Sequence, residues 1–171
     1  MSKPAHMLAA TYPDREHART ILDMLERMRR GHRIKLVDAA MATKDSEGKL
    51  QIEETQELTG RKGAGRGALI MGSFALFFPP SIIAGALAGG AIGAIAGRFH
   101  DSGVKNKQLH DLAARLEPGQ ALIIALAEEE SVAEVESALS GYDGTLVIAE
   151  IDAETLDKMH RQAFMEAGSE G

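Results

Sequence analysis

Residues 68–97 read ALIMGSFALFFPPSIIAGALAGGAIGAIAG, thirty consecutive residues without a charged side chain. In the second half of this stretch, glycine recurs at every fourth position, at Gly85, Gly89, Gly93 and Gly97. On a helix these four glycines would form one stripe that lets another backbone approach closely. Because each glycine disfavours an isolated helix by about 1 kcal/mol relative to alanine, we expect a packing partner against this stripe.

Two prolines, Pro79 and Pro80, interrupt the stretch and leave arms of 11 and 17 residues. Proline lacks the amide donor and restricts the residue before it, so a helix is expected to end here. A membrane-spanning helix needs about 20 apolar residues, so neither arm is long enough alone. We therefore expect a helical hairpin, with Gly72 of the first arm as a further packing position.

Positive charges flank the stretch on both sides and form what we name the basic collar: Arg61, Lys62, Arg66, Arg98, Lys105 and Lys107. With Asp101 included, residues 60–110 carry a net charge of +5, which leaves −11 for the rest of a chain whose total is −6. Positive charge at both ends favours a cytoplasmic position for both, and the collar suits anionic lipid headgroups. We expect the protein at the cytoplasmic face of a membrane. The alternative is a cytoplasmic assembly that buries the hairpin between subunits.

Length and composition limit the number of domains, the chemistry and the partners that this chain can have. A chain of 171 residues has room for one hydrophobic core, and the absence of cysteine excludes disulfides and thiolate sites. The first residues, MSKPAHMLAATYPD, have no long apolar core or cleavage site, so no signal peptide is expected. The acidic remainder would repel phosphates, and basic and aromatic residues are not interleaved, so we expect no nucleic-acid partner.

The residues before the hairpin predict a strand, a helix and two further strands. Residues 6–12 predict the first strand, and Asp14 is placed to cap an amphipathic helix that ends at Gly31. Residues 34–43 predict the second strand. After a turn at residues 45–48, alternation from Leu50 predicts an exposed third strand.

The residues after the hairpin predict further helices and strands. Residues 109–116 predict an amphipathic helix, and the apolar run 121–127 predicts a central strand covered on both faces. Ser131 with Glu134 has the pattern of a capping box for the next helix. Residues 145–151 predict the last strand, and a C-terminal helix is expected from residue 152.

This element order predicts an α+β fold of the ferredoxin-like class. The hairpin would be an insertion between the third strand and the second helix of a β-α-β-β-α-β core that is extended by α-β-α. We expect one discontinuous α+β domain over residues 1–59 and 104–166. Residues 60–103 would be the inserted glycine-rich hairpin and residues 167–171 a flexible tail.

Several motifs together resemble a known family. They are GRKGAGRGALIMG from position 60, the two prolines, AGALAGGAIGAIAG from 84, DSGV from 101 and LEPGQAL from 116. Their combination is similar to a bacterial family of predicted membrane proteins of unknown function, in which a small α/β body carries a glycine-rich apolar hairpin. The resemblance implies membrane association or oligomerisation. It implies no reaction and no catalytic residues.

Motifs for chemistry are weak in this sequence. Residues 63–68 match GxGxxA, a dinucleotide-binding pattern, but no convincing buried strand precedes them and no acid follows at the expected distance. The histidines show no metal-ligand spacing; His17 suits helix capping, and His100 suits the boundary of the apolar stretch. GxxxxGK[ST], HExxH and GxSxG do not occur. We expect no catalytic, cofactor or metal site.

The expected function is therefore that of a non-enzymatic, self-associating protein. Its glycine-zipper hairpin would mediate membrane association and packing between identical copies. A soluble homo-oligomer, such as a ring, cage or filament, is the first alternative, because an exposed apolar patch of this size would aggregate. The second alternative is a small-molecule-binding ferredoxin-like domain, which a convergent set of polar residues would favour.

Overall fold

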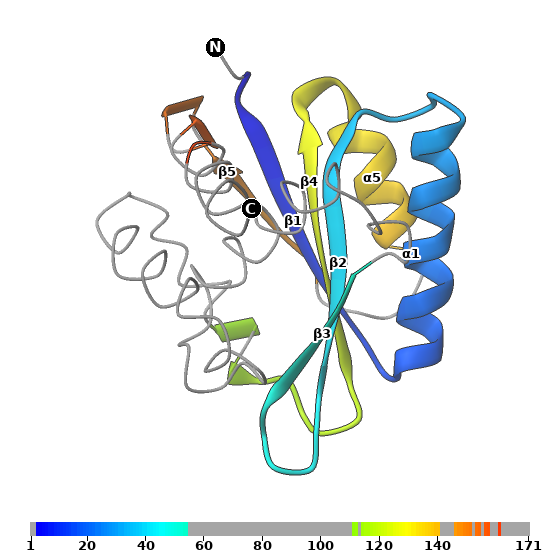
Figure 1. Cartoon of the computed structure of the whole chain (residues 1–171), viewed down its shortest axis with the longest axis vertical. Coiled ribbons are helices and arrows are strands. Elements are labelled where there is room, and N and C mark those ends of the chain that lie inside the picture. Colours follow the sequence, from blue (N-terminus) through cyan, green and yellow to red (C-terminus); the bar gives the residue numbers. More distant parts are fainter. Residues whose placement is uncertain are drawn as a thin grey trace, which may run out of the picture.

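The described part of the chain is an α+β structure built on one antiparallel sheet. The computed structural model describes residues 3–54, 111–112, 114–140, 146–151, 153–154, 156–157 and 161. These residues form a five-stranded sheet with the order β3-β2-β4-β1-β5, together with helices α1 and α5 (Figure 1). The elements are β1 (Ala5–Tyr12), α1 (Arg15–Arg30), β2 (Leu36–Lys44), β3 (Leu50–Glu54), β4 (Ala121–Glu128), a 3-10 turn (Glu129–Ser131), α5 (Val132–Leu139) and β5 (Leu146–Ile151).

Strand β4 occupies the middle of the sheet. It pairs with β1 on one side and β2 on the other, so that Leu126 lies opposite Met7 and Asp38. Every residue of β4 from 121 to 127 is buried. The prediction of a central strand covered on both faces is confirmed, and its physical basis is the apolar run that lacks the usual polar alternation.

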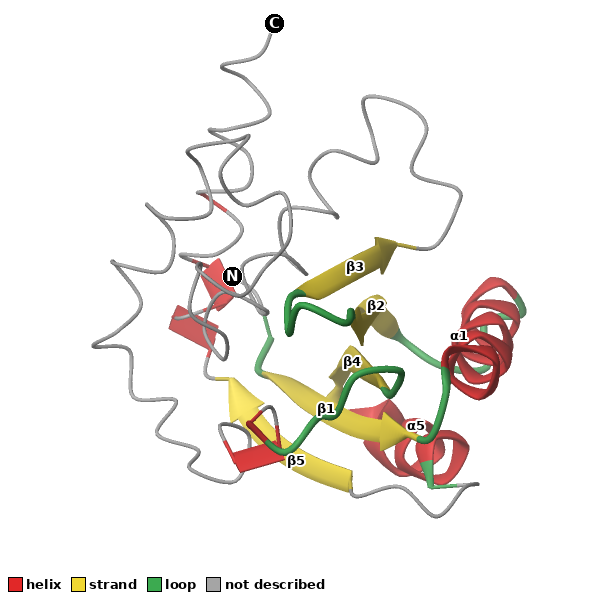
Figure 2. Ribbon diagram, turned by 90° about the horizontal axis from the view of Figure 1, so that it is seen from below, coloured by secondary structure: helices red, strands yellow, loops and turns green. Residues whose placement is uncertain are grey.

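The first face of the sheet is covered by two helices. Figure 2 shows α1 and α5 on the same side of the strands. Helix α1 buries Ala18, Ile21, Leu22 and Leu25, which recur at helical spacing. Helix α5 adds Val135 and Leu139, and these residues share one apolar cluster with Leu8, Met41 and Ile123 of the sheet.

The second face of the sheet is apolar as well. Its buried side chains alternate with those of the first face along each strand, and they include Met7, Ala9, Ala40, Ala42, Leu122, Ile124, Leu126 and Val147. Leu112, Leu116 and Leu156 belong to the same cluster. Both faces of this sheet are therefore part of the core.

Helix α1 has the ends that the sequence predicts. The carboxylate of Asp14 accepts a hydrogen bond from the backbone N–H of His17 at 2.8 Å, and Gly31 is the C-cap.

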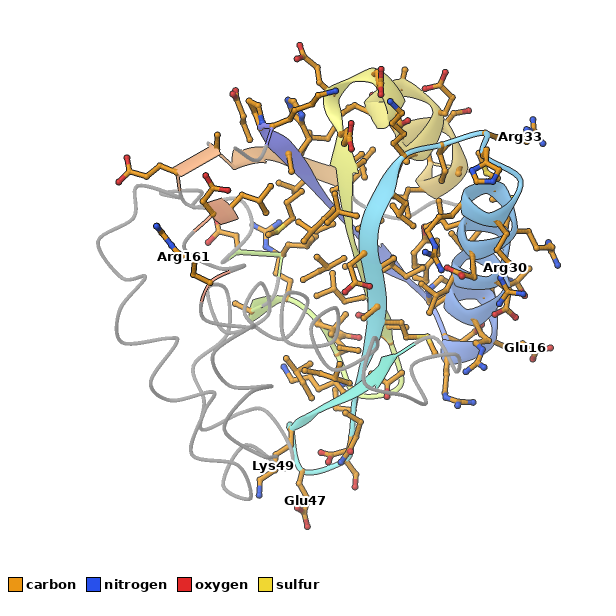
Figure 3. The ribbon with its side chains drawn as sticks, turned by 45° about the horizontal axis from the view of Figure 1, so that its top comes forward. Glu16, Arg30, Arg33, Glu47, Lys49 and Arg161 are labelled. Carbon is orange, nitrogen blue, oxygen red and sulfur yellow. The ribbon has the colours of Figure 1, made fainter. Side chains whose placement is uncertain are left out.

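The last turns of α1 carry an ion-pair cluster around Glu26. Burial raises the pKa of Glu26, but hydrogen bonds and charge from Arg29 and Arg30 outweigh this effect and lower the pKa below its ordinary value. Figure 3 shows Glu16 and Arg30 on the outer side of this helix.

The position of β3 differs from the predicted core. A ferredoxin-like core built from the first four predicted elements would insert residues 50–54 between β1 and β2, but β4 occupies that place. Strand β3 pairs only with β2, at the edge of the sheet. Exposed Gln51 between buried Leu50 and half-buried Ile52 suits an edge, whereas β4 has the apolar side chains that a central position requires.

A second correction concerns the start of α5. The hydroxyl of Ser131 makes no capping hydrogen bond. It is buried and instead accepts a hydrogen bond from the backbone N–H of Lys35 at 2.8 Å, which links this turn to the start of β2. Tertiary contact thus replaces the predicted capping box.

Parts of the predicted organisation lie outside the described residues. These are the hairpin at 60–103, the tail at 167–171 and most of the predicted helix at 109–116. Residues 111, 112 and 114 are helical, as are 153–154 and 156–157 of the predicted C-terminal helix. The domain boundaries remain a prediction.

Candidate functional site

The residues predicted to mediate packing and lipid contact all lie outside the described residues. They are Gly72, Gly85, Gly89, Gly93 and Gly97, the break at Pro79 and Pro80, and the basic collar of Arg61, Lys62, Arg66, Arg98, Lys105 and Lys107. The described chain leaves the sheet at the end of β3 and resumes at residue 111. Their roles remain predictions.

A cavity of about 440 Å³ lies where β1 ends and β5 begins. Among the described residues, its apolar lining includes Leu112, Leu116, Leu146 and Val147. The polar residues described in its lining are Thr11, Asp111, Arg115 and Gln120. Figure 1 shows the segment around residues 111–114 on the side of the sheet opposite α1 and α5.

Backbone contacts hold the wall of this cavity against the sheet. The Lys44 ammonium donates a hydrogen bond to the carbonyl of Leu116 at 2.8 Å, and the Gly119 N–H donates to the Lys44 carbonyl at 3.1 Å. Gly119 has φ +87°, a conformation that glycine adopts without steric cost. Since Leu116 is also buried, the segment is anchored by both its backbone and its side chain.

Two residues of opposite charge, Asp111 and Arg115, are among those that line the cavity. The Arg115 N–H donates to the Asp111 carbonyl at 3.1 Å, so the two residues are one helical turn apart. Both residues are exposed. Within the described part of the chain, neither side chain makes an ion pair or hydrogen bond.

A second, more open hollow of about 730 Å³ lies between α1 and α5. Met24 and Met28 of α1 face Ala133 and Ala138 of α5 across it. Arg33, which Figure 3 shows at the end of α1, lies at its border. The groove is mainly apolar and offers few groups that fix the orientation of a small ligand.

Two glutamates at the end of β4 and just after it lie close to lysines. Glu130 forms an ion pair with Lys35, and Glu128 lies 3.8 Å from the Lys3 ammonium. The hydrogen bond and the charge of Lys35 lower the pKa of Glu130, and the same contact raises the pKa of Lys35. The side chains of Glu130 and Lys35 are exposed, and negative charge at this position suits the start of the helix that follows.

Two further kinds of site can be considered among the described residues, a metal centre and a proton-transfer site at His17. Among them, no three His, Asp or Glu side chains are grouped to bind a metal ion. His17 Nδ1 lies 2.6 Å from Asp14 Oδ2 at the exposed start of α1, in the capping arrangement that was expected. None of the helices in the described part of the chain is long and apolar enough to cross a membrane.

The described residues define the class of the protein: an α+β fold with a five-stranded antiparallel sheet, one face of which is covered by α1 and α5. Residues 61–164 match the family model described as a protein of unknown function (DUF1269), and the chain belongs to this family. The match begins at the basic collar and includes β4, α5 and β5. No curated protein and no solved structure matches the chain. The resemblance to an uncharacterised family is confirmed.

Sequence reasoning missed the polar lining of the cavity. The helix at 109–116 was predicted from its leucines, and the spacing of Asp111 and Arg115 places them together on that helix. What the sequence does not reveal is the neighbour of this charged pair. Thr11 and Leu146 reach the same cavity only because β5 pairs with β1.

Proposed function

We propose that this protein is a non-enzymatic, self-associating membrane-associated protein, with residues 68–97 as the segment that contacts lipid and identical copies. The observation that carries the proposal is the run of thirty uncharged residues with glycine at every fourth position. Apolar surface of this extent requires an apolar environment. Close contact between helices would compensate for the destabilising effect of four glycines on a helix.

The extent of the family match supports this proposal. It covers the whole apolar segment together with β4, α5 and β5. The apolar segment therefore lies inside the matched range. The matched range joins a glycine-rich apolar stretch to two of the five strands of the sheet.

We propose further that the body has a ferredoxin-like core of a modified order. Strand β4 lies between β1 and β2, which are linked by α1, and β5 lies on the far side of β1. This is the split β-α-β arrangement of that fold. In this proposal β3 is an added edge strand, and the apolar segment follows it as an insertion before β4.

Charge distribution supports a membrane as the environment of the segment. The basic collar surrounds the apolar run, whereas the rest of the chain carries −11. Near an anionic bilayer, each collar residue contributes about 1 kcal/mol to binding. The acidic body would then stay in water on the cytoplasmic side. A detergent-independent homo-oligomer that buries the same segment between subunits is the alternative.

Substitutions on the glycine stripe test this function. Gly89→Leu or Gly93→Leu should reduce the mass of the particle measured by light scattering, because a leucine prevents close approach of the helices. Ala91→Leu is the matched control: two positions beyond Gly89, it lies about 200° around a helix and should leave the mass unchanged. Circular dichroism checks that the body remains folded. An unchanged mass in both glycine variants contradicts the proposal.

A further inference from the structure

We propose that the cavity beside β1 and β5 binds a small zwitterion with an apolar body, of the class of α-amino acids with a branched aliphatic or aromatic side chain. The cavity lies in the described body, so this inference does not depend on the role of the apolar segment. It rests on the size of the cavity, the separation of its apolar and polar linings, and its pair of opposite charges.

The size and lining of the cavity suit a small organic molecule. Its volume of about 440 Å³ falls within the range of roughly 300–1,000 Å³ that is typical of ligand sites. Four aliphatic side chains from two separate parts of the chain form the apolar lining: Leu112, Leu116, Leu146 and Val147. An aliphatic or aromatic side chain would displace water from these surfaces.

The polar lining supplies partners for both ends of a zwitterion. The guanidinium of Arg115 has a planar set of donors that matches a carboxylate. One turn earlier, the Asp111 carboxylate can accept hydrogen bonds from an ammonium group. The Gln120 Oε1 already accepts from the Glu117 N–H at 2.9 Å, which leaves the Gln120 amide N–H groups as donors.

The balance of charge favours a zwitterion over a simple anion or cation. A ligand with only a carboxylate would meet Arg115 but would also bring its charge near Asp111. A ligand with only an ammonium would have the opposite conflict. Two charges of opposite sign on neighbouring atoms of the ligand match two opposite charges one helical turn apart.

The cavity wall is held in place before any ligand binds. Leu112 and Leu116 are anchored in the core cluster on the second face, and Lys44 bonds the carbonyl of Leu116. The floor is a pair of antiparallel strands in which Val147 lies opposite Ala9. A site held in this way loses little conformational freedom on binding.

Calorimetric titration of the full chain tests the inference with three probes that differ by one charged group. L-leucine has both groups, 4-methylpentanoate lacks the ammonium, and 3-methylbutylamine lacks the carboxylate. We expect saturable binding of L-leucine at millimolar or lower concentration and binding at least about tenfold weaker for each of the other two. L-Isoleucine and L-phenylalanine should also bind, because the cavity has room for their side chains.

Two substitutions assign the charges. Arg115→Gln should weaken the binding of both L-leucine and 4-methylpentanoate. Asp111→Asn should weaken the binding of L-leucine, so that the protein no longer prefers L-leucine to 4-methylpentanoate. Arg33→Gln and Glu134→Gln make the same charge changes beside the groove between α1 and α5, and they should leave binding unchanged. Failure of all three amino acids to bind, or binding unaffected by both cavity substitutions, overturns the inference. Neither result bears on self-association.

Discussion

At the scale of single residues, the hydroxyl of Tyr12 links the end of β1 to the end of α5. It donates a hydrogen bond to the carbonyl of Leu139 at 2.8 Å, and Tyr12 is 2% exposed. Because this carbonyl lies at the last turn of α5, it has no partner within the helix. The contact therefore satisfies a helix end that packing has removed from water.

Tyr12→Phe should accordingly destabilise the protein by about 1–3 kcal/mol, since it leaves the Leu139 carbonyl buried without its donor. Urea unfolding measures this loss. The matched control is Thr20→Val, which removes an exposed hydroxyl that donates to the Glu16 carbonyl at 3.1 Å. The control should change stability by no more than about 0.5 kcal/mol. Equal losses in the two variants would show that the buried contact has no special role.

The cap of α1 gives a second prediction at this scale. The backbone hydrogen bond from His17, with smaller contributions from its side chain, lowers the pKa of Asp14 below its ordinary value of 3.8. A carboxylate with a lowered folded-state pKa stabilises the protein above its unfolded-state pKa, and this contribution disappears as pH falls through the folded-state value.

The melting temperature of Asp14→Asn should therefore lie below that of the unmodified protein near neutral pH, and the difference should shrink as the pH falls below 3.8. Asparagine retains the acceptor for the His17 N–H but lacks the charge. Asp14→Ala loses both, so it should remain less stable at every pH. Thermal unfolding followed by circular dichroism over this pH range makes the comparison. A constant difference for Asp14→Asn would contradict the assigned pKa shift.

At the scale of elements, the central strand β4 combines both faces of the core. Ile123 belongs to the cluster under α1 and α5, and Ile124 belongs to the cluster on the opposite face. Both side chains are at most 1% exposed. Neither face of β4 is therefore a solvent face.

Ile123→Ala and Ile124→Ala should each cost about 2–5 kcal/mol, because both create a cavity in packed surroundings. Ile52→Ala in the edge strand β3 should cost less, since Ile52 is only half-buried. The three free energies of unfolding can be compared by urea denaturation. A small loss for Ile124→Ala alone would mean that the second face is not a core in solution.

Most elements of the described fold can be predicted from local sequence patterns. The helical spacing of Ile21, Leu22 and Leu25 predicts α1, and the cap at Asp14 and the stop at Gly31 define its ends. Strand pairing is a different matter, because hydrophobic patterns do not specify which strand lies beside which. For the same reason, the interaction of Ser131 with Lys35 could not be predicted from the local motif.

At the scale of the whole molecule, the cavity shows why a site is harder to predict than a fold. Its lining comes from the end of β1, the segment at 111–120 and the start of β5. These stretches meet only through the order of strands in the sheet. The glycine stripe and the basic collar, by contrast, are evident from spacing and charge alone. Whether lipid or identical subunits surround them is decided by the experiment below.

The central claim is that residues 68–97 hold the protein at a membrane and join identical copies, and cell fractionation tests it directly. Cells that express the protein are broken without detergent, membranes are separated from cytosol by sedimentation, and each fraction is sized. We predict that the protein sediments with membranes and is released by detergent as an oligomer. Gly89→Leu should reduce the mass of that oligomer. A monomer that remains in the cytosolic fraction without detergent would contradict the claim, and a large detergent-independent particle would favour the assembly buried between subunits.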